Sequence, residues 1–144
     1  GRPSSFVYRD ALWRGSDMIG TGVASISHMA GVHYQNEASW DDYLGALGDG
    51  RLPIGRALPT TAAQRLTREM ILQLKLGRIR PPYFRDKYGV DVLAEFEPAW
   101  RTLQSEGMLS VADDEVALTA TGLLRVDQLL PLFYAAEFQN ARYT

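Results

Sequence analysis

The sequence predicts an α+β fold that is mainly helical and ends in a winged-helix-like domain. Apolar residues recur at helical spacing in residues 60–76 and again in residues 91–104. Two short alternating runs, Ser110-Val111 and residues 115–118, then flank Asp113-Asp114, which is typical of a hairpin. A last helical segment follows this hairpin. Helices, a two-stranded wing and a closing helix together predict such a domain.

Proline and glycine set the expected limits of these helices. Gly77 is expected to end the first of them. Pro81-Pro82 opens a short helix that stops at Gly89, because proline suits a first turn and glycine a C-terminal end. The closing helix is expected over residues 119–133, where Pro131 bends or ends it.

The first part of the chain carries fewer regular signals. Residues 6–12 alternate loosely and predict a short strand or an irregular segment. The apolar pair Met18-Ile19 predicts a strand. Ser39 is expected to cap a helix that places Trp40, Tyr43, Leu44 and Leu47 on one face.

A domain boundary is predicted where two prolines interrupt the chain. Residues 52–59 have the composition of an extended linker between helical segments. We therefore expect one domain over residues 1–58 and a second over residues 59–144. Because residues 6–36 hold only one or two strands that lack a sheet, we expect the N-terminal third to be poorly ordered or rearranged and to be able to pair with a second copy.

Small residues dominate the stretch that follows Met18-Ile19. Gly20, Gly22, Ser25 and Ser27 carry little side-chain bulk, so the backbone there can approach a ligand closely. A loop at a strand end is where α/β folds place their ligands. Tight turns need glycine as well, so both a ligand loop and a structural turn remain open.

Composition and charge narrow the classes of function. The chain has 144 residues, of which 46% are hydrophobic and 22% charged, as in globular proteins. It has no apolar run near the roughly twenty residues that span a bilayer and no secretion signal, so we expect a cytoplasmic protein without membrane contact. The net charge of -2 disfavours a general nucleic-acid binder. Cysteine is absent, which excludes disulfides, thiolate metal sites and cysteine nucleophiles in this chain.

Charge is divided unevenly within the predicted winged-helix-like domain. Residues 60–90 hold seven basic and two acidic residues, and residues 91–117 hold one basic and seven acidic residues. The acidic part contains the third helix and the wing, which would face phosphates in a DNA complex, so we expect no nucleic-acid binding. We interpret the basic part as a face that pairs with acidic groups. Contact with substrate carboxylates is the alternative.

Residues 8–36 resemble the last barrel strand and the following loop of oxygen-independent coproporphyrinogen III oxidases, a family of radical SAM proteins. That family shows a segment close to GLGVSAIS, followed by Tyr-x-Gln-Asn. The matching residues here are Gly20, Gly22, Val23, Ser25, Ile26, Ser27, Tyr34, Gln35 and Asn36. The resemblance continues through Asp42-Tyr43-Leu44, residues 50–53 and residues 68–71 to the C-terminal domain.

The resemblance implies a cofactor side and a substrate side for this stretch. By its match to the family, Ile26 would border S-adenosylmethionine, within a cofactor-side loop that includes Gly20, Gly22, Ser25 and Ser27. An apolar side chain there would exclude water from a radical. The candidates for the substrate side are Gln35, Asn36 and His28.

The resemblance also implies that this chain is the C-terminal part of a longer protein. Radical SAM enzymes hold a [4Fe-4S] cluster with three closely spaced cysteines, and this chain has none. We expect the parent to bind S-adenosylmethionine and the cluster, and this part alone to bind neither and to be inactive. Its expected partners are the missing N-terminal barrel and, in the parent, a porphyrinogen or heme.

Two other functions remain open. The parent could be a heme carrier or a heme-opening enzyme, although only Trp13 matches the His-Asn-x-x-Tyr-Trp motif of the heme-carrying branch. The chain could also be a free-standing interaction module. His28 and His33 could ligate heme iron, but their spacing fits no two-ligand motif, so we predict no metal ligands.

Overall fold

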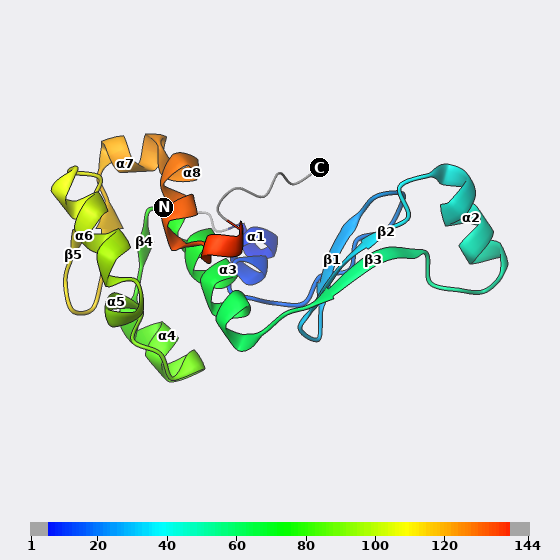
Figure 1. Ribbon diagram of the computed structural model, residues 1–144, viewed down its shortest axis with the longest axis horizontal. Coiled ribbons are helices and arrows are strands. Elements are labelled where there is room, and N and C mark those ends of the chain that lie inside the picture. The colour runs from blue at the N-terminus through cyan, green and yellow to red at the C-terminus, as the bar shows by residue number, and fades with distance from the viewer. Residues whose placement is uncertain (1–5, 139–144) are drawn as a thin grey trace. The chain divides into compact units, whose positions relative to one another are not determined.

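The computed structural model describes residues 6–138, which form two compact units (Figure 1). The first unit ends at Arg65 and the second begins at Leu66, within helix α3. No helix among these residues is long and apolar enough to cross a membrane.

The first unit is built on a three-stranded antiparallel sheet in the order β1-β2-β3. Its elements in chain order are α1 (Val7–Leu12), β1 (Ile26–Met29), β2 (Val32–Asn36), α2 (Trp40–Gly48) and β3 (Ile54–Pro59). Strands β1 and β2 are joined by Ala30 and Gly31, both with positive φ, as a tight hairpin turn requires. The stretch expected to be a loop is therefore largely a hairpin.

Three further expectations for this unit were wrong. Residues 6–12 contain helix α1 instead of a strand, since arginine, alanine and leucine favour helix there. Met18 pairs with His28 only as an isolated β-bridge. The glycine-rich segment that follows Met18 does not continue this pairing, so no strand forms there. Residues 54–59 of the expected linker form β3, which pairs with β2 along its length.

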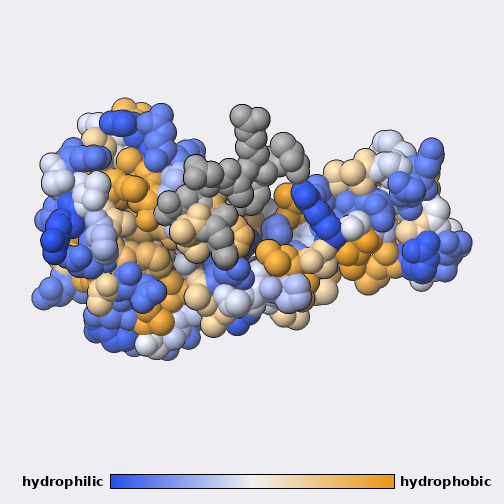
Figure 2. Space-filling view, viewed as in Figure 1, coloured by the Kyte–Doolittle hydropathy of each residue, from blue (hydrophilic) through white to orange (hydrophobic). Residues whose placement is uncertain are grey.

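Helix α2 begins as predicted and packs differently from a core helix. The side chain of Ser39 accepts a hydrogen bond from the Asp42 backbone N–H and so caps it. Its apolar face is exposed: Trp40 retains 65% and Leu44 56% of its accessible surface. Figure 2 shows apolar residues at the surface of this unit as well as on the second.

The second unit combines helices with a small antiparallel sheet in the order β4-β6-β5. Its elements are α3 (Ala62–Leu74), β4 (Arg78–Ile79), α4 (Pro81–Tyr88), α5 (Val92–Glu95), α6 (Glu97–Ser105), β5 (Leu109–Val111), β6 (Val116–Leu118), α7 (Ala120–Leu124), α8 (Val126–Leu129) and the 3-10 turns η1 (Leu130–Phe133) and η2 (Ala136–Phe138). The predicted order of helices and hairpin is confirmed. The third strand, β4, was not predicted.

Two predicted helices are interrupted. The third helix breaks at Phe96 into α5 and α6, because Pro98 has no N–H to donate to the preceding turn. The closing segment likewise divides into α7, α8 and η1. Thr119 caps α7 through its hydroxyl, which accepts a hydrogen bond from the Gly122 N–H.

The hydrophobic core lies in the second unit. It gathers side chains from α3 to η1, listed in chain order as Leu66, Met70, Leu74, Ile79, Phe84, Val92, Ala99, Trp100, Leu103, Met108, Leu109, Val116, Leu129, Leu130 and Phe133. In residues 6–65, the buried side chains are instead small or polar: Ser27, His28, Asn36, Ala46 and Pro53. The first unit is thus held mainly by backbone pairing.

Candidate functional site

The small-residue loop folds back onto its own hairpin. A side chain at Gly20 would meet the carbonyl oxygen of Ile26 at 2.4 Å, so only glycine fits there. The Gly20 N–H donates to the Ser27 hydroxyl at 3.0 Å, and Ser27 is fully buried. The close approach that makes glycine necessary at this position is therefore to the protein's own strand.

Asn36 and Tyr43 hold the rest of this loop. The buried Asn36 amide donates from Nδ2 to the carbonyls of Gly20 at 3.2 Å and Gly22 at 2.9 Å. Gly22 has a φ of 102° and donates its N–H to the Tyr43 hydroxyl at 3.1 Å. The Ser25 hydroxyl donates to the loop's own backbone. These contacts give Gly20, Gly22, Ser25, Ser27 and Asn36 a structural role in shaping the loop.

Two of the predicted residues lie in one row across the sheet. Ile26 is the cross-strand partner of Gln35, and Gln35 is the partner of Arg56. Directly opposite residues project from the same face of an antiparallel sheet. Ile26 keeps 49% of its surface exposed, and the Arg56 Nε donates to Gln35 Oε1 at 2.8 Å. This row offers an apolar group, an amide and a cation to a ligand.

His28 and His33 form the neighbouring row. They are opposite each other in the β1–β2 register, with ring centroids 6.1 Å apart, and His28 is buried. Within residues 6–138 there is no group of three or more His, Cys, Asp or Glu side chains that could hold a metal ion. We therefore see in the pair a packing contact between two strands.

A polar cluster in the second unit was not predicted. Glu69 on α3 is 1% exposed and accepts hydrogen bonds from the hydroxyl groups of Tyr83 and Tyr88, the latter at 2.6 Å. It also accepts from Lys87 Nζ at 2.8 Å and from Gln73 on its own helix. A buried carboxylate is thereby surrounded by donors, as its burial requires.

The cluster shifts two pKa values upward. Burial and the hydrogen bond to Glu69 raise the pKa of Tyr83 above its ordinary value of 10.0. For Lys87, burial alone would lower the pKa, but its hydrogen bonds to Glu69 and Tyr83 outweigh it and raise the pKa above 10.5. Both groups therefore stay protonated at neutral pH.

Comparison with known proteins identifies the second half of the chain. Residues 60–125 match the family described as the HemN C-terminal domain. The match covers just under half of the chain. No curated protein sequence matches the chain.

A solved structure extends the likeness beyond the HemN C-terminal domain. It is the coproporphyrinogen III oxidase HemN from Escherichia coli, described as a radical SAM enzyme. The two folds superpose with a TM-score of 0.72 over 82% of this chain, at 20% sequence identity. The chain spans 28% of that enzyme's length. The resemblance stated from the sequence is thus confirmed by the family match over residues 60–125 and by the shared fold over 82% of the chain.

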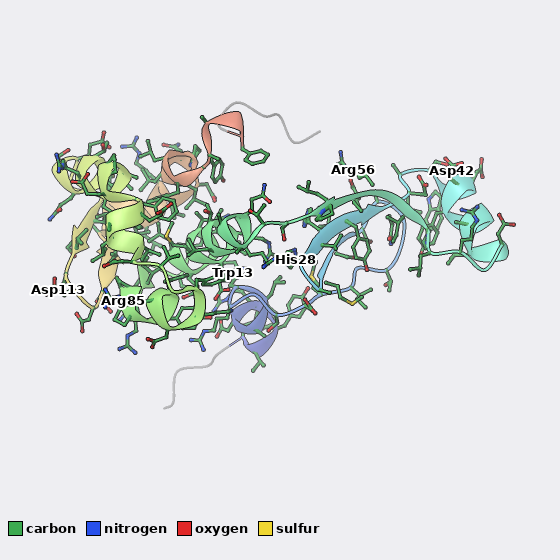
Figure 3. The ribbon with its side chains drawn as sticks, turned by 60° about the horizontal axis from the view of Figure 1, so that its bottom comes forward. Trp13, His28, Asp42, Arg56, Arg85 and Asp113 are labelled. Carbon is green, nitrogen blue, oxygen red and sulfur yellow. The ribbon has the colours of Figure 1, made fainter. Side chains whose placement is uncertain are left out.

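Within the second unit, the basic segment pairs largely with nearby acids. Arg85 contacts Asp91 at 3.0 Å, Lys87 contacts Glu69, and two more pairs join Lys75 to Asp127 and Arg78 to Glu115. Figure 3 labels Arg85 among the side chains of this unit. These pairs support the interpretation of this segment as a structural, paired face.

Sequence reasoning missed Arg56 and Glu69, and each carried a signal. Arg56 was placed in a linker, although its partner Gln35 had been singled out. Glu69 follows Leu66 by three positions and precedes Met70, which places it on the buried stripe of α3. A charge on an apolar stripe predicts a buried polar cluster.

Proposed function

We propose that this chain is the C-terminal part of a radical SAM protein related to coproporphyrinogen III oxidase. The observation that carries the proposal is the HemN C-terminal domain at residues 60–125. It is supported by the fold shared with the E. coli enzyme over 82% of the chain. The parent would act in the cytoplasm on propionate side chains of a porphyrinogen.

Each unit would have a separate task in the parent. The first would supply the last barrel strand and a cofactor-side loop, with Ile26 toward S-adenosylmethionine. The second, a winged-helix-like domain, would cover the open barrel. The paired charges of this domain favour a scaffold over a DNA-binding surface.

The donor atoms of this chain fit the two expected cofactors differently. A [4Fe-4S] cluster needs thiolates, and the chain contains no cysteine, so the cluster ligands would lie elsewhere in the parent. S-adenosylmethionine fits the exposed apolar side chain of Ile26 beside the amide of Gln35. The chemistry that these cofactors supply in such a protein is hydrogen abstraction from a propionate, followed by oxidative decarboxylation.

Product analysis with the full-length protein tests this function. The protein would be reconstituted with iron and sulfide without oxygen. It would then be given a low-potential reductant for the cluster, an electron acceptor for the decarboxylation, and S-adenosylmethionine with either coproporphyrinogen III or heme. We expect cleavage of S-adenosylmethionine together with decarboxylated porphyrinogen. Opening or transfer of heme, with coproporphyrinogen left intact, would contradict the proposal and favour the heme-handling relatives.

A further inference from the structure

The side chain of Gln35 is held at both ends. Its Nε2 donates to the carbonyl oxygen of Ala24 at 2.9 Å, and its Oε1 accepts from Arg56 Nε at 2.8 Å. Ala24 is itself fixed, with a φ of 57° and an N–H that donates to the Glu37 carbonyl at 2.8 Å. The loop, the amide and the guanidinium therefore form a connected chain of hydrogen bonds.

This chain of contacts orients Arg56 without neutralising it. Its partner is a neutral amide, and no ion pair to Arg56 is found within the described part of the chain. Glu37 lies against Gly55, where an added side chain would meet its carboxylate at 2.9 Å, and it forms no ion pair with Arg56.

The remaining nitrogens of Arg56 point outward. Arg56 is exposed, and Figure 3 shows its side chain extending from β3 away from the sheet. With Nε engaged, the two Nη atoms remain for a planar acceptor, and a guanidinium fork matches a carboxylate in two parallel hydrogen bonds. Ile26, on the same row, and Leu58, two residues along β3, give an apolar surface beside it.

We propose that Arg56 binds a carboxylate of the ligand and that Gln35 is its positioning residue. This inference rests on the proposed function for its choice of ligands. Two ligands of the parent carry a carboxylate next to an apolar body: the porphyrinogen, through its propionates, and S-adenosylmethionine, through its amino-acid end. The row Ile26–Gln35–Arg56 fits either source.

Arginine side-chain NMR of the full-length protein tests the proposal directly. The Arg56 Nε–Hε resonance would be followed during titration with coproporphyrin III, the stable oxidised form of the porphyrinogen, and separately with S-adenosylmethionine. The variants are Arg56→Gln and the control Arg51→Gln, which removes the same charge from an exposed arginine paired with Asp49. A third variant, Gln35→Glu, still offers Arg56 a hydrogen-bond acceptor, but its carboxylate neutralises the charge of the guanidinium.

We expect one of the two ligands to shift the Arg56 resonance in the unsubstituted full-length protein. Arg56→Gln should weaken that binding about tenfold or more, as loss of hydrogen bonds to a charged group predicts. Gln35→Glu should weaken ligand binding as well, which would not be expected if Gln35 only held the loop in place. Arg51→Gln should leave ligand binding unchanged.

The two ligands separate this inference from the proposed function. A shift of the Arg56 resonance with S-adenosylmethionine alone would support binding of a carboxylate by Arg56 and would assign that carboxylate to the cofactor. This result would hold whatever the parent's substrate proves to be. A shift with coproporphyrin III would assign it to the substrate. Two results would contradict binding of a carboxylate by Arg56: no shift with either ligand at millimolar concentration, or equal binding by the Arg56→Gln and Arg51→Gln variants. Neither result would bear on the activity proposed for the parent.

Discussion

Glu69 joins α3 to α4 through hydrogen bonds from Tyr83, Lys87 and Tyr88. Replacing it with alanine leaves the hydroxyl groups of Tyr83 and Tyr88 and the ammonium of Lys87 without their shared acceptor. Because Lys87 is partly exposed and can be hydrated, the main cost is the lost acceptor of the two hydroxyl groups, about 1–3 kcal/mol. We expect urea unfolding of the Glu69→Ala chain to show a loss of that size.

The control for this variant is a carboxylate at the surface. Glu97 pairs with Arg101 one turn along α6, and both side chains are exposed. Glu97→Ala should cost about 1 kcal/mol or less, because solvent screens such pairs. Equal losses for the two variants would show that Glu69 is not buried among its partners in solution.

The raised pKa values of Tyr83 and Lys87 predict an alkaline limit of stability. A group whose pKa is higher in the folded state than in the unfolded state stabilises the fold fully at pH values below its pKa in the unfolded state. This contribution is lost as the pH rises through its pKa in the folded state. The ordinary values are 10.0 for tyrosine and 10.5 for lysine. We expect the free energy of unfolding to fall above pH 10, and to fall less steeply in Glu69→Gln. Parallel pH profiles for the two chains would contradict this.

The elements that the sequence predicted well are those with local signals. The cap at Ser39, the start of the closing segment at Thr119, the helix end at Gly89 and the β5–β6 hairpin each depend on residues close in the chain. The missed strands depend on distant partners. Strand β4 has two residues and exists only through pairing with β6, and β3 pairs with β2 twenty or so residues earlier.

The β1–β2 hairpin was missed because its turn is unusual. Ala30 adopts a positive φ, which glycine or asparagine usually adopts in such turns. The pair Ala30-Gly31 therefore did not predict a hairpin turn. For the candidate site, the predicted residues Ile26 and Gln35 do share a row. Arg56, the third member, could not be found before β3 was known to be a strand.

Helix α6 and the β5–β6 hairpin predict that the chain does not bind DNA. Three acids of this region, Asp91, Glu97 and Glu115, are paired with arginines. Four others are exposed without an ion pair among the described residues: Glu95, Glu106, Asp113 and Asp114. DNA binding requires cations at such positions. We expect no duplex binding at physiological salt, and a gel shift at micromolar concentration with a steep salt dependence would contradict it.

The two units of the molecule should differ in stability. The second has a core of large apolar side chains, whereas small and polar side chains fill the interior of the first. A three-stranded sheet with little apolar burial opens readily. Hydrogen exchange should show strong protection after Thr60 and weak protection before Trp40. Uniform protection along the chain would show that the first unit is stabilised by another contact, such as a second copy.

The division of tasks between the units is the central claim, and Ile26 tests it most directly. Its side chain is half-exposed in the first unit and lies outside the core of the second. In the full-length protein, Ile26→Asp would place a charge against the cofactor, whereas Ile26→Val removes one methylene at a cost of about 0.5–1.5 kcal/mol.

The measurement is turnover of coproporphyrinogen III by these two variants, together with thermal unfolding of the HemN C-terminal domain. We expect Ile26→Asp to abolish turnover, Ile26→Val to retain most of it, and the domain to unfold at the same temperature in both. If aspartate and valine give the same turnover, Ile26 does not lie at the cofactor, and the functional assignment of the first unit is wrong.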